Sequence, residues 1–139
     1  MRLMEQEGII YVGTCDKAGI PNIGPRTAFW TTDEGSLVWC SWFQRRTYWN
    51  MTQNNHVSVA VVDSANLTGY QMKGHVELVE DPGKIMKLMQ LVMTKSRHVL
   101  FNRIMQSQSG SPPLLVRFKL EELYSLAPTE SSRYPIPLS

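Results

Sequence analysis

Short apolar runs separated by turn residues recur along the 139-residue chain. Most runs are rich in β-branched and aromatic residues and are bounded by Gly, Pro, Asn or Asp, the pattern of β-strands joined by turns. The pattern predicts six strands, which cover residues 9–14, 20–32, 36–42, 56–63, 68–80 and 114–126. Residues 20–32 should form an irregular strand. Its early part should be an edge or a bulge, because Pro21 and Pro25 lack the amide hydrogen that a neighbouring strand needs. The last strand should run over 114–120 and resume at 123–126.

A second, helical spacing of apolar residues appears between some of these strands. It predicts helices over residues 2–7, over about 45–54, from Pro82 onward, and around 100–105. Proline is favoured at a first helical position, and the apolar positions 85, 88, 89 and 92 then follow one helix face. Residues 107–113 should be a loop. The tail from Pro128 carries Pro135 and Pro137 and should not be helical.

The order of these elements limits the fold. Strands joined mostly by short turns, with a helix after the third and helices before the last, do not make a βαβ array. No repeat and no linker is visible, and the length suits one domain over residues 1–139, with its core over 8–127 and a tail over 128–139. We therefore expect a mainly β fold, a closed or split antiparallel barrel with helices across its openings.

Composition and charge narrow the class of protein. The chain is 42% hydrophobic and 19% charged, which is typical of a globular protein, and its net charge of +2 is too small to indicate nucleic-acid binding. Between Pro82 and Leu120 there are seven basic residues and no acidic one. This basic stretch either attracts an anionic substrate such as a nicotinamide dinucleotide or is simply a solvated helix face.

Several kinds of site lack their usual pattern. Cys15 and Cys40 are far apart and lie in strand-like runs, and His56, His75 and His98 show no metal-ligand spacing, so no metal site is expected. No Ser-His-Asp set, glycine-rich dinucleotide motif, secretory signal or membrane-spanning run is visible. A cytoplasmic protein is the default expectation, and the catalytic residues remain unknown.

The end of the third strand carries the most informative residues. Arg45, Arg46 and Thr47 stand where a strand is predicted to end and a helix to begin. A helix start presents free N–H groups and a positive dipole, and guanidinium and hydroxyl groups there suit a phosphate. The alternative is a capped helix whose arginines are only solvated.

The whole pattern resembles the pyridoxamine 5'-phosphate oxidase-like family of FMN-binding split β-barrels. The segments that carry the resemblance are 8–14, 21–26, 46–50, 57–63, 69–74 and 116–126, so it covers roughly residues 8–127. No single segment is a strong motif, and their joint order and spacing make the match. It implies a six-stranded antiparallel split β-barrel with flanking helices, and FMN bound in a groove between the two barrels of a homodimer.

The resemblance also implies site residues, position by position. The cofactor-binding residues that it predicts are Pro25, Arg26, Thr27, Trp39, Cys40, Ser41, Trp42, Arg45, Arg46, Thr47, Gln71 and Lys73. Arg46 and Thr47 would hold the phosphate, and residues 25–27 would lie beside the ribityl chain or the phosphate. The run 39–42 would lie along the isoalloxazine, where either tryptophan could stack on the flavin or pack in the core. Gln71 and Lys73 would lie near the flavin of the same subunit or of the other one.

Three functions follow from this resemblance. The first is an FMN-dependent oxidoreductase that passes electrons through bound FMN to a small acceptor, with NAD(P)H as a transient donor and neither nucleic acid nor membrane as a partner. The second is a non-catalytic FMN-binding or electron-transfer protein, and the third a barrel for another flat anionic ligand, such as haem or a deazaflavin, or for a protein partner. The chain end, residues 132–139, lacks the arginine–histidine pair of true pyridoxamine phosphate oxidases, so that activity is not expected.

Overall fold

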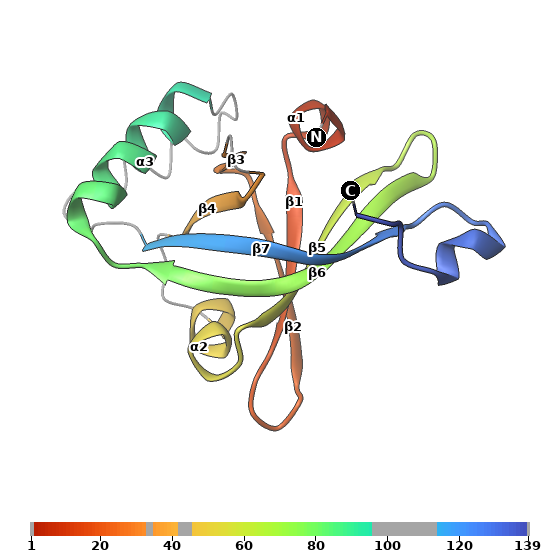
Figure 1. Ribbon diagram of the computed structural model, residues 1–139, viewed down its shortest axis with the longest axis horizontal. Helices are drawn as coiled ribbons and strands as arrows, with labels where there is room; N and C mark the ends of the chain where they lie inside the picture. Colours follow the sequence, from red (N-terminus) through yellow and green to blue (C-terminus); the bar gives the residue numbers. More distant parts are fainter. Residues whose placement is uncertain (1, 33–34, 42–45, 96–113, 139) are drawn as a thin grey trace.

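The computed structural model describes residues 2–32, 35–41, 46–95 and 114–138. The helices are α1 (Arg2–Glu7), α2 (Arg46–Gln53) and α3 (Pro82–Lys95), and a 3-10 helix, η1, spans Glu130–Arg133. The strands are β1 (Ile10–Cys15), β2 (Pro21–Arg26), β3 (Phe29–Thr31), β4 (Leu37–Ser41), β5 (His56–Asp63), β6 (Thr68–Val79) and β7 (Leu114–Ser125). In Figure 1, β6 and β7 run side by side across the molecule, with α3 at one end and η1 at the other.

All seven strands form one antiparallel sheet in the order β2-β1-β5-β6-β7-β4-β3. The mainly β split-barrel prediction is confirmed, whereas the predicted count of six strands is wrong. Residues 20–32 form two strands, because the chain leaves the sheet after Arg26 and crosses from one edge to the other. Of the two alternatives that the prolines predicted, an edge or a bulge, the structure shows an edge, because β1 is the only strand that pairs with β2 among the described residues.

The main core lies on one face of the curled sheet, here called the inner face. Alternate residues of β1 and β5 are buried there, as the period-2 pattern requires. Among the described residues, Trp39 and Phe118 are the largest fully buried side chains, and their ring centroids are 6.3 Å apart. The inner-face core consists of Met4, Ile10, Val12, Leu37, Trp39, Met51, Val57, Val59, Val61, Met72, Val76, Val116 and Phe118.

A smaller cluster lies on the other side of β4. It consists of Ala28, Trp30, Val38, Cys40 and Leu115, with Val79 and Ile85 packed against it. Ile85 belongs to α3, so this helix covers the part of the outer face formed by β3, β4 and the start of β7. Strand β4 is therefore buried on both faces, which explains why all five of its residues are buried.

A β-bulge interrupts the pairing of the two longest strands. Lys73 pairs with Glu122 and Gly74 with Leu120, so Glu121 is an extra residue of β7. The predicted interruption at residues 121–122 is this bulge within one continuous strand. Bulges bend a strand and redirect its side chains.

The predicted helices over 2–7, about 45–54 and from Pro82 are confirmed. The expectation of a non-helical tail is wrong at Glu130–Arg133, because the two prolines that oppose a helix lie beyond this turn. The tail then returns to the sheet, where the Ile136 amide donates to the Leu123 carbonyl at 2.6 Å. The predicted helical stretch around 100–105 and the loop over 107–113 lie outside the described residues. In the part of the chain that is described, no helix is long and apolar enough to cross a membrane.

Candidate functional site

A polar cluster joins the inner face of β2 to the start of α2. Asn22, Gly24 and Arg26 alternate along β2 and pair with the buried residues Thr14, Val12 and Ile10, so they share the inner face. Helix α2 begins beside them and packs against β1 and β2. The Asn22 amide donates to Thr47 Oγ1 at 3.0 Å, which ties the strand to the first turn of the helix.

The missing side chain of Gly24 leaves room at the centre of this cluster. A Cβ atom at Gly24 would lie 3.3 Å from Arg26 Nη1 and 3.5 Å from Thr47 Oγ1. The guanidinium and the hydroxyl therefore converge on one point over the glycine. We call Asn22, Gly24, Arg26, Arg46 and Thr47 the cradle.

Arg26 is a partly buried cation with few partners. Its Nη1 donates to the Pro25 carbonyl at 2.6 Å, while its Nε is buried without a hydrogen-bond acceptor. Among the described residues it forms no ion pair, and burial lowers the pKa of the guanidinium because desolvation disfavours its charged form. A buried cation without a carboxylate is costly unless an anion binds to it.

The start of α2 adds to this positive site. Arg46 is exposed at the first position of the helix, next to the buried Thr47. The free N–H groups of a first turn and the helix dipole both favour an anion at this place. The structure thus brings together Pro25, Arg26, Arg46 and Thr47 of the predicted site, with the half-buried Thr27 directly after Arg26. Predicted residue Arg45 lies outside the described residues.

The opposite, outer face of the sheet carries a groove of about 750 Å³. Gly13 has no side chain, and Ser58, which pairs directly with it, has a small one. The two residues therefore form the floor of the groove between Ile23 and Lys73. Its lining residues are Gly13, Thr14, Cys15, Pro21, Asn22, Ile23, His56, Val57, Ser58, Lys73, Gly74, Glu121 and Glu122. Asn22 belongs to both the groove and the cradle, so the two meet at the start of β2.

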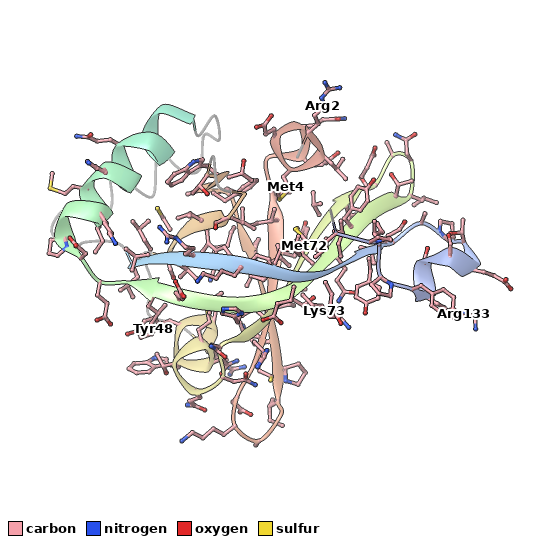
Figure 2. All side chains as sticks on the ribbon, in the orientation of Figure 1. Arg2, Met4, Tyr48, Met72, Lys73 and Arg133 are labelled. Atoms are coloured by element: carbon pink, nitrogen blue, oxygen red, sulfur yellow. The ribbon has the colours of Figure 1, made fainter. Side chains whose placement is uncertain are left out.

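Gln71 and Lys73 belong to the outer face. Met72 and Lys73 are neighbours on β6 and lie on opposite sides of the strand, one in the core and one exposed (Figure 2). Gln71 Nε2 donates to Ser58 Oγ at 2.8 Å, and Lys73 Nζ lies 4.9 Å from the centre of the Tyr124 ring. The predicted site residues therefore form two groups, the cradle on the inner face and Gln71 with Lys73 on the outer face.

The predicted run 39–42 lies elsewhere. Trp39 is fully buried in the inner-face core, and Cys40 is in the cluster under α3, where burial raises the pKa of its thiol to about 12. Ser41 is buried at the end of β4. None of these three residues lines the groove, and Trp42 lies outside the described residues. A thiol with so high a pKa is not a nucleophile at neutral pH.

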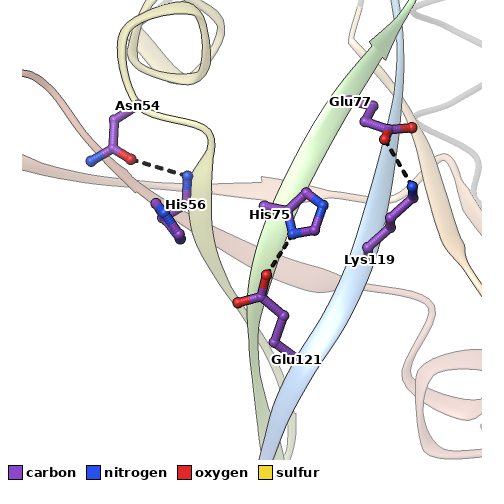
Figure 3. Close-up of polar contacts among 6 residues, drawn as sticks. All are labelled: Asn54, His56, His75, Glu77, Lys119 and Glu121. Atoms are coloured by element: carbon purple, nitrogen blue, oxygen red, sulfur yellow. Dashed lines mark hydrogen bonds and ion pairs between the residues drawn. The ribbon is translucent and has the colours of Figure 1, made fainter.

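The histidines form a second set of polar contacts on the outer face. His56 and His75 pair across β5 and β6, and His75 Nδ1 lies 2.6 Å from Glu121 Oε1, while Lys119 pairs with Glu77 at 2.8 Å (Figure 3). Within residues 2–32, 35–41, 46–95 and 114–138, no three His, Cys, Asp or Glu side chains are placed to hold a metal ion. His98 lies outside these ranges.

Four residues of these two groups had no predicted role in the site: Asn22, Gly24, Ser58 and Tyr124. The alternation of Asn22, Gly24 and Arg26 was a usable signal, because it places all three on one face of a strand. The partner of Asn22 is 25 positions away, however, and only the packing of α2 on β2 reveals it.

Comparison with known proteins gives one family. The family model described as Pyridoxamine 5'-phosphate oxidase matches residues 1–127. No curated protein matches the chain.

Solved structures with this fold come from several bacteria. HupZ of Group A Streptococcus has a TM-score of 0.71 at 21% identity, covering 91% of this chain and 90% of its own. A Clostridium acetobutylicum protein related to general stress protein 26, of the pyridoxinephosphate oxidase family, has a TM-score of 0.70 at 18% identity, covering 89% and 82%. General Stress Protein 26 of Bacillus anthracis has a TM-score of 0.60 at 13% identity, covering 87% and 85%. At these identities the likeness shows the fold alone.

Proposed function

Because the chain belongs to the pyridoxamine 5'-phosphate oxidase family, we propose that it is an FMN-dependent oxidoreductase whose cradle holds the FMN phosphate. The main support for the proposal is the state of Arg26. This guanidinium is partly buried, its Nε has no acceptor, and it forms no ion pair among the described residues. A phosphate dianion supplies both the charge and the acceptor oxygens that this group lacks.

The cradle fits a phosphate in its chemistry. Arg26 and Arg46 supply two cations, Thr47 supplies a hydroxyl, and the start of α2 supplies backbone N–H groups. Bound FMN would supply two-electron chemistry at its ring, and the protein would supply position and electrostatics. NAD(P)H is the proposed transient electron donor, since the sequence has no glycine-rich dinucleotide motif.

A homodimer is part of this proposal. The cradle lies on the inner face and Gln71 with Lys73 on the outer face, so one chain does not present both groups to one ligand from the same side. A second copy could bring its Gln71 and Lys73 to the FMN held by the first cradle. Exposed apolar side chains on the outer face, Tyr11, Ile23 and Val62, support burial of this face against a second copy.

The substrate is proposed to differ from pyridoxamine phosphate. Residues 130–138 contain Arg133 but no histidine, so this segment does not match the arginine–histidine pair of true pyridoxamine phosphate oxidases. A small electron acceptor is the substrate class that we propose.

The test begins with the absorbance spectrum of the purified protein, recorded after FMN is added and the excess removed. We expect flavin bands to stay with the protein, NADH or NADPH to be turned over, and light scattering to give the mass of a dimer. Retained flavin without turnover would favour a non-catalytic electron-transfer protein instead. If the purified protein is colourless and does not bind added FMN, but binds added haem or a deazaflavin, the choice of cofactor is contradicted.

A further inference from the structure

We propose that Tyr124 and Glu122 are positioning residues that keep the Lys73 ammonium free of a carboxylate and available to an anionic ligand in the groove. Under the proposed function, on which this inference rests, that ligand is FMN. The pyrimidine edge of its ring gains negative charge on reduction. Lys73 itself would contact the ligand, whereas Tyr124 and Glu122 would act through Lys73.

The sheet register makes the free state of Lys73 unexpected. Lys73 and Glu122 are directly paired across β6 and β7, and opposite charges at such positions normally attract each other. Among the described residues, however, no carboxylate lies within ion-pair distance of Lys73 Nζ. Its contact is the face of the Tyr124 ring, 4.9 Å from the centroid.

Both nearby carboxylates have other partners. The Tyr124 hydroxyl donates a hydrogen bond to Glu122 Oε2 at 3.0 Å, and this bond raises the pKa of the Tyr124 phenol. The bulge at Glu121 turns the other carboxylate to His75, where Oε1 lies 2.6 Å from Nδ1 (Figure 3). The bulge and the tyrosine together keep two glutamates away from one lysine.

The arrangement gives the groove a usable cation. Lys73, Glu121 and Glu122 all line the groove, so an ion pair between Lys73 and Glu122 would neutralise the charge that a ligand meets there. The face of an aromatic ring attracts an ammonium without neutralising it. Tyr124 therefore supports Lys73 with its ring and occupies Glu122 with its hydroxyl.

The test is a cycle of three variants, Tyr124→Phe, Glu122→Gln and the double variant, with the midpoint potential of bound FMN as the readout. Y124F keeps the ring but frees Glu122 to pair with Lys73. We expect Y124F to lower the affinity for reduced relative to oxidised FMN about threefold. For a two-electron couple, this change lowers the midpoint potential by about 14 mV. E122Q should not lower the potential, and the double variant should match E122Q rather than Y124F. A purely structural role of Tyr124 would not predict this rescue.

A second measurement needs no cofactor. The difference between tyrosinate titrations of the FMN-free wild type and Y124F isolates Tyr124, and E122Q should lower the pKa of this phenol because the accepting carboxylate is gone. An unchanged potential in Y124F, or a double variant as low as Y124F, would overturn the positioning role while leaving FMN binding intact. A wild-type protein that binds no FMN would instead remove the proposed function and with it this ligand.

Discussion

Replacing Arg26 by methionine is expected to weaken FMN binding by about 10- to 150-fold, the equivalent of one lost charge-assisted interaction of roughly 1.5–3 kcal/mol. In the FMN-free protein the same change should leave the melting temperature unchanged or slightly higher. Methionine fills similar space, and it removes a buried Nε that has no acceptor and a cation that has no carboxylate among the described residues. Fluorescence titration of FMN and thermal unfolding of the FMN-free protein measure the two effects.

A matched control for this change is Arg133→Met. Arg133 is an exposed arginine on η1, away from the cradle (Figure 2). R133M should bind FMN as tightly as the wild type. If R26M loses stability without FMN but keeps its affinity for FMN, Arg26 is a structural residue and the cradle is misassigned.

Replacing Gly74 by alanine should destabilise the protein by about 3 kcal/mol and lower its melting temperature by about 10 °C. A Cβ atom at Gly74 would collide with the backbone carbonyl of Lys119 and lie 3.0 Å from a ring carbon of Phe118. Both neighbours belong to β7 beside the bulge, and a backbone atom in a paired strand cannot move as a flexible side chain can. Chemical denaturation with FMN absent measures the change in the free energy of unfolding.

Gly13→Ala provides the comparison for this glycine. Gly13 also lies in a strand, but the nearest atom to its Cβ position is the Ser58 carbonyl oxygen at 3.5 Å, an ordinary contact. The free energy of unfolding of G13A should lie within about 0.5 kcal/mol of the wild-type value, as it does for most substitutions away from special sites. Equal stabilities of G74A and G13A would mean that the close approach of β6 and β7 at the bulge does not exist.

Local patterns predicted most of the strands. Strand β5 has the predicted bounds, His56–Asp63, because its apolar run and flanking turn residues decide both ends. The two prolines limited β2 to an edge or a bulge, but they could not show that the chain then crosses to the opposite edge of the sheet. That crossing depends on how the sheet curls, which no local pattern encodes.

The candidate site was predicted only in part, because the rest of it also depends on packing between distant elements. Arg46 and Thr47 were assigned to a helix start, which a strand end followed by polar residues indicates, and the structure begins α2 at Arg46. Trp39 was a candidate for stacking on a flavin or for core packing, and its ring lies in the core. The choice depends on which face of β4 the residue takes, and Trp39 lies on the inner face, whose core comes from strands distant in the sequence. The contact between Asn22 and Thr47 depends likewise on packing between elements.

The central claim is that the cradle holds a phosphate, and the most direct test is to compare the affinities of the wild-type protein for FMN and riboflavin. The two ligands share the same ring and ribityl chain and differ in the phosphate alone. We predict that FMN binds at least about 100-fold more tightly, since a phosphate in the cradle makes several charge-assisted bonds. Equal affinities would contradict the account and leave the cradle as a capped helix beside a poorly paired arginine.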